Sequence, residues 1–235
     1  MNPRERILAR IREALTVPAP RPGAHGHDTD HGARPTAPSP AGRPVHLARA
    51  WLPPGGSTPD EQLARFAAAS AELKTEFRCV ASEAEAHAQL RQMATDEGWK
   101  RVASHHAPLT DAATSALGCP ALFTDGGYTP DDLEACDAGI TTCDCLVAQS
   151  GSLVVNSRTS GGRALSVLPP HHVVLARRDQ LVGDLTAAFQ RVEELHGQNW
   201  PSMISLVTGP SRTGDIERIL VLGAHGPKKL TVLMW

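Results

Sequence analysis

The last quarter of the chain contains Met203-Ile-Ser-Leu-Val-Thr-Gly-Pro-Ser-Arg-Thr-Gly-Asp-Ile-Glu217, followed by His225-Gly-Pro227. The apolar run Ile204 to Val207 predicts a buried strand, and Thr208 to Gly214 predicts a loop rich in glycine and hydroxyl groups. Glycine lets a ligand approach the backbone, and arginine offers a fork of donors that suits a carboxylate or a phosphate. We therefore expect this loop to bind a small anion through Arg212 and neighbouring backbone N–H groups.

The same loop also has a purely structural interpretation. Ser211 or Thr213 would cap a short helix, with Asp215 in its first turn and Arg212 in solvent. Short glycine-rich patterns are unspecific, so the spacing alone does not decide between the two interpretations.

The composition is that of an ordinary globular protein. The chain has 235 residues, 41% of them hydrophobic, and a formal net charge of -2. Nucleic acid is not expected as a partner, because phosphate binding needs a concentrated basic face. The beginning of the chain lacks the apolar core of a signal peptide, and no run of about 18 apolar residues occurs. We expect a cytoplasmic protein without a membrane span.

The five cysteines do not form a recognisable metal motif. The spacing of Cys136, Cys143 and Cys145 matches neither a C-x-x-C pair nor a ferredoxin run. Buried structural thiols are favoured over metal or cluster ligands, because free cysteine is commonly a core residue. No metal site is predicted.

Composition divides the chain into three segments. Residues 1–16 have the pattern of an amphipathic helix, and its apolar stripe needs a surface to cover it. That surface is its own domain, a second copy in a homo-oligomer, or a membrane or other partner. Residues 17–59 are rich in proline and glycine and predict a linker. Residues 60–235 form the predicted globular domain.

Helical and strand patterns alternate in this domain. Capping boxes begin helices at Thr58 and Ser82, and short apolar runs follow them. The alternation predicts an α/β fold with a mostly parallel central sheet flanked by helices. His105 and His106 follow one predicted strand, where α/β proteins place ligand loops. At most one of the two is expected to face a site, and a surface position is the alternative.

Two further segments offer polar groups near predicted strands. Gln149-Ser-Gly-Ser152 lies between two apolar runs and predicts a hairpin that can project Gln149 and Ser152 into a cleft, an ordinary turn being the alternative. Arg163 lies in a glycine-rich loop, where it would bind an anion or hold the loop in place.

Three blocks of this sequence combine glycine, hydroxyl and histidine residues with apolar runs. They are Gly139-Ile-Thr with Asp144 and Ala148-Gln-Ser-Gly-Ser-Leu-Val154; Gly162-Arg-Ala-Leu-Ser-Val-Leu-Pro-Pro-His-His172; and Ser205 to Glu217 with Val221-Leu-Gly-Ala-His-Gly-Pro227. In this order the blocks resemble the LUD domain, which defines the lactate utilization protein C family. The resemblance implies the α/β architecture of the NagB, RpiA and CoA-transferase group, with ligands at the carboxyl ends of central strands.

The resemblance also implies a function. It implies a component of an L-lactate utilization system that oxidises lactate to pyruvate together with iron–sulfur partner proteins, with no cofactor assigned to this chain. A stand-alone enzyme or a ligand-binding module for a small phosphorylated or CoA-linked metabolite is the alternative.

One position departs from the family pattern. Gln149 stands where many relatives carry glutamate, and the related CoA transferases use a glutamate as covalent nucleophile. An amide can neither attack in this way nor take a proton, so covalent CoA transfer at this position is not expected. His225 is the best acid/base candidate, because imidazole titrates near neutral pH. A histidine that only fixes its loop is the alternative.

The candidate residues come from three separated blocks that each follow apolar strands, so we expect them to converge on one cleft. The catalytic candidate is His225. The residues expected to bind a small anionic metabolite are Gln149, Gly151, Ser152, Arg163, Gly209, Ser211, Arg212, Thr213, Asp215 and Gly226.

Overall fold

A computed structural model describes Glu5, Ala9 and residues 53–214, 220–223 and 225–235. Glu5 and Ala9 are helical. The rest of the expected N-terminal helix and the linker up to residue 52 lie outside the described residues, as does Asp215. Within residues 53–214, 220–223 and 225–235, no helix is long and apolar enough to cross a membrane.

A six-stranded sheet forms the centre of the domain. Every pair of neighbouring strands in it is parallel, so the predicted mostly parallel α/β architecture is confirmed. The chain's last strand, β12, lies between β1 and β7. In spatial order the strands are β1 (Glu76–Cys79), β12 (Lys229–Met234), β7 (His171–Ala176), β4 (Ala138–Thr142), β2 (Val102–Ser104) and β3 (Ala121–Phe123).

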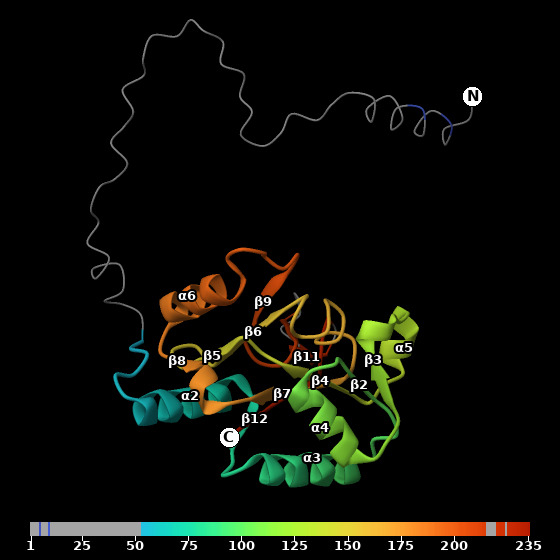
Figure 1. Cartoon of the computed structure of the whole chain (residues 1–235), viewed down its shortest axis with the longest axis horizontal. Coiled ribbons are helices and arrows are strands. Elements are labelled where there is room, and N and C mark those ends of the chain that lie inside the picture. Colours follow the sequence, from blue (N-terminus) through green and yellow to red (C-terminus); the bar gives the residue numbers. More distant parts are fainter. Residues whose placement is uncertain (1–4, 6–8, 10–52, 215–219, 224) are drawn as a thin grey trace, which may run out of the picture. The chain divides into compact units, whose positions relative to one another are not determined.

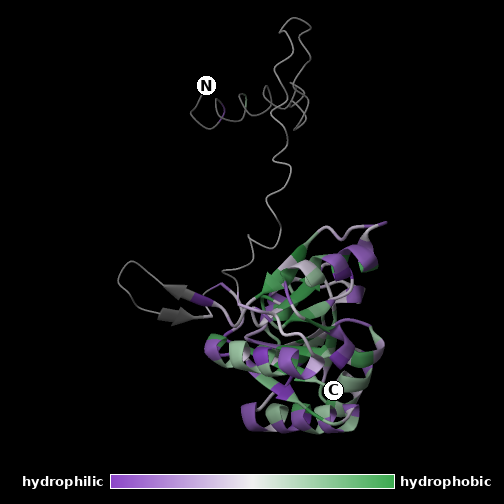
Figure 2. Cartoon of the chain, turned by 90° about the vertical axis from the view of Figure 1, so that its left-hand side faces the viewer, coloured by the Kyte–Doolittle hydropathy of each residue, from purple (hydrophilic) through white to green (hydrophobic). Residues whose placement is uncertain are grey.

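Helices α3 (Glu83–Glu97) and α4 (Pro108–Leu117) cover one face of this sheet (Figure 1). Helix α3 begins as the sequence predicts, because the Ser82 side chain accepts a hydrogen bond from the Glu85 backbone. Its apolar stripe, including the fully buried Leu90, packs against strands β2, β4 and β7. Figure 2 shows mainly apolar residues in the interior strands and polar residues on the outward helix faces.

The other face is covered by helix α2 (Pro59–Leu73) and by a second sheet of four strands. Helix α6 (Leu185–His196) packs on the outer side of that sheet. The predicted hairpin is confirmed as the antiparallel pair β5–β6. The strands of the second sheet are β8 (Leu181–Val182), β5 (Cys145–Val147), β6 (Ser152–Asn156) and β9 (Ile204–Val207).

Two details of residues 203–214 differ from expectation. Strand β9 is only partly buried, because it lies at the edge of its sheet. The predicted loop is shorter than expected, because β10 (Arg212–Gly214) pairs antiparallel with β11 (Leu220–Leu222). A short helix, α5 (Pro130–Glu134), completes the described elements together with the 3-10 turns Thr124–Gly126 and Arg178–Gln180.

The cysteines are free thiols with different surroundings. Cys136, Cys143 and Cys145 are buried, whereas Cys79 is exposed at the end of edge strand β1 and Cys119 is partly buried. Burial raises the pKa of Cys145 to about 12 and the pKa of Cys143 well above its usual range. The described residues contain no group of three His, Cys, Asp or Glu side chains arranged to hold a metal ion.

Candidate functional site

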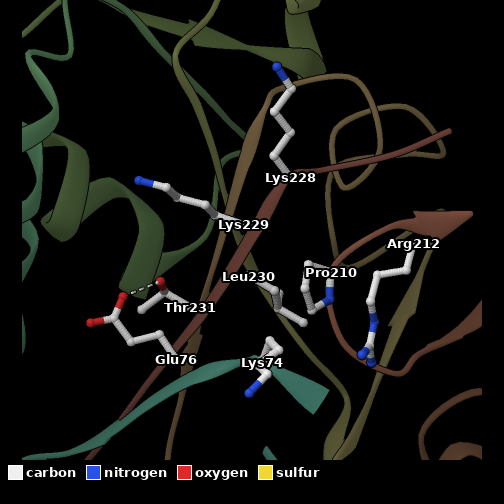
Figure 3. Close-up of a pocket in the computed structure, with 8 residues that line it drawn as sticks. All are labelled: Lys74, Glu76, Pro210, Arg212, Lys228, Lys229, Leu230 and Thr231. Carbon is white, nitrogen blue, oxygen red and sulfur yellow. Dashed lines mark hydrogen bonds between the residues drawn. The ribbon is translucent and has the colours of Figure 1, made fainter. Parts of the chain in front are cut away.

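A cleft of about 490 Å³ lies at the amino ends of β1 and β12. Figure 3 shows Pro210 and Leu230 between Arg212 on one side and Glu76 with Thr231 on the other. We call this cavity the basic cleft. Its lining residues are Lys74, Glu76, Pro210, Arg212, Lys228, Lys229, Leu230 and Thr231.

Local geometry brings these side chains together from three parts of the sequence. Helix α2 ends at Lys74, whose φ of 65° turns the chain directly into β1. Among the described residues, Lys74 is the one non-glycine residue with positive φ, in a position where glycine is usual. Glu76 and Thr231 are then partners in the parallel register of β1 and β12.

The basic cleft has an excess of positive charge. Within the described part of the chain, Lys74, Arg212 and Lys228 form no ion pair. Lys229 Nζ lies 2.9 Å from Glu97 Oε1, and Glu76 pairs with Arg78. All four cations of the cleft are exposed, so they would attract a carboxylate or phosphate through charge-assisted contacts at a hydrated surface.

The structure does not bring Arg212 and His225 into one cavity. His225 and Gly226 line a neighbouring cavity of about 520 Å³, which shares Lys228 with the basic cleft. His225 is exposed there, and its acid/base role stays a prediction. A Cβ on Gly226 would lie 3.2 Å from Ser211 Cβ, so close packing between the two segments favours glycine at this position.

The backbone of the predicted anion loop is largely used within the protein. The Ser211 N–H donates to the Pro227 carbonyl at 2.9 Å, and the Ser211 carbonyl accepts from Gly223 N–H at 3.0 Å. Arg212 and Thr213 belong to the β10–β11 ladder. The Ser211 N–H is therefore not free for a ligand, and a role for the other amides of this loop stays a prediction. Pro210 and Arg212 are the residues of this loop that line the cleft.

Gly151, Ser152 and Gly209 have packing roles behind the cleft. A Cβ on Gly151 would meet Leu73 Cδ1 at 2.9 Å, and a Cβ on Gly209 would meet the Leu73 carbonyl oxygen at 3.1 Å. Ser152 Oγ lies 2.7 Å from Thr208 Oγ1. None of the three lines the basic cleft. Their small size allows the turns to pack against the end of α2.

The side chains of Gln149 and Arg163 form hydrogen bonds to backbone carbonyls of other segments. Gln149 Nε2 donates to the Pro53 carbonyl at 2.6 Å, which fastens the residues preceding α2. Arg163 Nη2 donates to the Ser202 carbonyl at 3.1 Å, which ties its loop to the start of β9. Neither side chain lines the basic cleft.

At the carboxyl edge of the central sheet, the two adjacent histidines have different surroundings. His105 is buried with Nε2 3.4 Å from Thr142 Oγ1, and burial lowers its pKa. His106 points outward, stacks on Phe123 and bonds Asp111 at 2.8 Å. One of the two histidines therefore faces the interior and the other the solvent. The expectation that at most one of them faces a site stays a prediction.

Comparison with known families shows what the chain is similar to. Residues 125–234 match the LUD domain. This segment is similar to LUD domains. A stretch of 106 residues is 37% identical to a protein named lactate utilization protein C from Shouchella clausii, and a stretch of 103 residues is 36% identical to one from Macrococcus caseolyticus. These matches cover 45% and 43% of this chain and 46% and 45% of the relatives, so the chain spans about half their length.

Two other comparisons span more of this chain. An uncharacterized protein of Neisseria meningitidis serogroup B is 26% identical over 240 residues, which cover 99% of this chain and 93% of that protein. A crystal structure of a DUF162 family protein from Deinococcus radiodurans has a TM-score of 0.61 at 21% identity, covering 76% of this chain and 99% of that chain. This last likeness shows the fold alone.

Several residues of the basic cleft were not predicted from the sequence. Lys228 and Lys229 had a usable signal, since they are paired cations directly before the last apolar strand. Lys74 had a weaker one, because it stands where a helix is usually ended by glycine. Glu76 had none, since its place beside Thr231 depends on the pairing of β1 with β12.

Proposed function

We propose that this protein is a component of an L-lactate utilization system that oxidises lactate to pyruvate together with iron–sulfur partner proteins. We further propose that it binds a carboxylate ligand in the basic cleft. The names of its relatives support the system, and the uncompensated cations of the cleft support the binding.

The observation that carries the binding proposal is the charge arrangement of the cleft. Lys74, Arg212 and Lys228 have no ionic partner among the described residues, so a bound carboxylate would supply the missing charge. The volume of about 490 Å³ lies in the range of small-molecule pockets. A charge-assisted contact typically contributes about 1.5–3 kcal/mol.

The number of cations favours a second candidate. Four positive side chains line the cleft, which is more than one carboxylate requires and better suited to a phosphate group. A stand-alone enzyme or binding module for a phosphorylated or CoA-linked metabolite is therefore the alternative to a lactate system component.

Titration calorimetry of the full-length protein with L-lactate, pyruvate, phosphate and CoA tests the binding proposal. Arg212→Ala should weaken binding about ten- to a hundredfold, because it removes one charge-assisted contact. Arg163→Ala is the matched control, since Arg163 is an arginine outside the cleft. Absence of binding to the wild type, or equal effects of the two substitutions, would show that the cleft is not the anion site.

A reconstitution assay tests the system. Lactate-dependent dye reduction should need both this protein and its iron–sulfur partners, and should fall with Arg212→Ala. Turnover by this protein alone would instead support the stand-alone enzyme. Lactate-dependent reduction by the partners without this protein would contradict its place in the oxidation.

A further inference from the structure

A chain of hydrogen bonds runs from helix α3 to the basic cleft. Glu97 Oε2 lies 3.0 Å from His171 Nδ1, and His171 Nε2 lies 2.8 Å from Thr231 Oγ1. Thr231 Oγ1 in turn lies 3.1 Å from Glu76 Oε2, the contact drawn in Figure 3. Thr231 and Glu76 line the cleft. Thr231 and His171 are both buried, with 1% and 2% of their surfaces exposed, whereas Glu76 is exposed. One hydroxyl group therefore separates a buried imidazole from the cleft.

Several contacts hold the Glu97 end of this hydrogen-bonded series. Glu97 accepts from Lys229 Nζ at 2.9 Å and from Trp99 Nε1 at 3.1 Å. The Trp99 ring packs edge-on against the imidazole of His171 with centroids 5.4 Å apart. Because an ionised carboxylate only accepts hydrogen bonds, His171 Nδ1 carries the proton toward Glu97. In a neutral imidazole, Nε2 is then the acceptor that faces Thr231.

The hydrogen-bonded series from Glu97 through His171 and Thr231 to Glu76 can accept one more proton. With His171 neutral, the single hydroxyl hydrogen of Thr231 faces two acceptors, His171 Nε2 and Glu76 Oε2, so one contact lacks a proton. With His171 charged, Nε2–H donates to Thr231 and the Thr231 hydroxyl donates to Glu76. Every contact then has its own hydrogen.

Burial and the Lys229 charge oppose that extra proton, whereas the Glu97 and Glu76 carboxylates favour it. Burial lowers the pKa of His171, Glu97 and Glu76 raise it, and Lys229 lowers it. Its buried neighbour His172 has no carboxylate partner among the described residues, and Arg78 already pairs with Glu76. An anion in the basic cleft would add negative charge beside Lys229 and on the same side of His171 as Glu76. The pKa of His171 would then rise, because a nearby negative charge favours the imidazolium.

We propose that the basic cleft takes up its anion together with a proton, which His171 holds and Thr231 passes to and from the cleft. The proposal rests on the proposed function only in taking the basic cleft as an anion site. It assigns His171 and Thr231 an acid/base role toward an anionic ligand such as a hydroxy or keto acid.

Calorimetry in two buffers of different ionisation enthalpy measures the protons taken up per bound anion. Sulfate and L-lactate are suitable probes, because neither titrates between about pH 5 and 7. We expect net uptake approaching one proton in this window. Affinity should rise as pH falls, by at most about tenfold per pH unit. An NMR titration of the His171 imidazole should show its pKa moving upward when sulfate is added.

Substitutions at Thr231 test the relay itself. Thr231→Val keeps the shape but removes the hydroxyl, which leaves imidazolium Nε2–H without an acceptor, so proton uptake should disappear. Thr231→Ser keeps the hydroxyl and should retain it, which also controls for loss of folding. Arg212→Ala should weaken sulfate binding while the number of protons per bound anion stays the same.

The outcomes separate the two proposals. Sulfate binding with proton uptake but without lactate binding would leave the relay standing and remove lactate as the ligand. Lactate binding without proton uptake, or full uptake in Thr231→Val, would overturn the relay and leave lactate binding intact. Failure of both anions to bind would overturn both.

Discussion

Two carboxylate–histidine pairs of similar geometry lie in different surroundings. Asp144 Oδ2 lies 2.9 Å from His196 Nε2, with side-chain exposures of 4% and 6%. Glu97 Oε2 lies 3.0 Å from His171 Nδ1, with exposures of 27% and 2%. The distances do not distinguish the two pairs, so their roles depend on the other groups that each pair contacts.

The Asp144–His196 pair is buried and its carboxylate is enclosed by other protein groups. Asn156 Nδ2 donates to Asp144 Oδ2 at 2.7 Å, and Thr159 Oγ1 donates to Asp144 Oδ1 at 3.0 Å. These contacts join the second sheet, the loop after β6 and the end of α6. The Glu97–His171 pair is instead connected through Thr231 to the basic cleft. The same pair of side chains is structural when its carboxylate is enclosed, and is available for chemistry when one partner faces a cavity.

The largest expected effect comes from breaking the Asp144–His196 pair. Asp144→Ala should lower the free energy of unfolding by about 3–5 kcal/mol, because His196 and Asn156 lose their partner inside the protein. Glu97→Ala should cost only about 1–3 kcal/mol, since His171 keeps Thr231. Urea unfolding followed by circular dichroism measures both. Equal losses of unfolding free energy in Asp144→Ala and Glu97→Ala would contradict the distinction between the two pairs. Asp144→Asn is the control that removes the charge but keeps the shape.

A histidine without a carboxylate partner sharpens the comparison through pH. His172 Nε2 lies 2.8 Å from Thr141 Oγ1, Nδ1 has no hydrogen-bond partner among the described residues, and burial lowers the pKa of His172 to about 3. The unfolded chain, with a pKa near 6.5, binds more protons below that pH. Stability is therefore complete above about pH 6.5 and falls as pH decreases, by about 2 kcal/mol at pH 5 from this residue.

Urea unfolding between pH 5 and 7 checks this expectation. His171 and His105 change stability in the same direction, because burial lowers the pKa of each. The contribution of His172 is therefore the difference between wild type and His172→Gln. His106→Gln replaces an exposed histidine and serves as the control. If His172→Gln keeps the full pH slope, His172 is not the buried neutral group described here.

The fold could be predicted further than the site. Alternation of patterns predicted the parallel sheet, and the caps at Thr58 and Ser82 predicted where α2 and α3 begin. The second sheet was not predicted as a unit, because β8 has only two residues and β9 pairs with the distant β6. Such pairing is set by packing between distant segments, which local patterns do not contain.

The site shows the same limit at single residues. Arg212 was predicted from its loop and lines the basic cleft. Glu76 was not, because its partner Thr231 lies 155 positions away in the chain. Gly151 and Gly209 were expected to admit a ligand, yet Leu73 occupies the space beside both. A sequence indicates that something approaches a glycine, but the fold decides whether that neighbour is a ligand or a side chain.

The smallest expected effect separates stability from binding at the basic cleft. Lys74 adopts a left-handed conformation that costs a residue with a Cβ about 1 kcal/mol more than glycine. Lys74→Gly should therefore be more stable than Lys74→Ala by about that amount, although both remove the same cation from the basic cleft. Both should weaken sulfate binding to a similar extent. Thermal unfolding and calorimetry on the same samples measure the two effects. Equal stability of the two variants would mean that the backbone relaxes at this position, whereas unchanged sulfate affinity would remove Lys74 from the anion site.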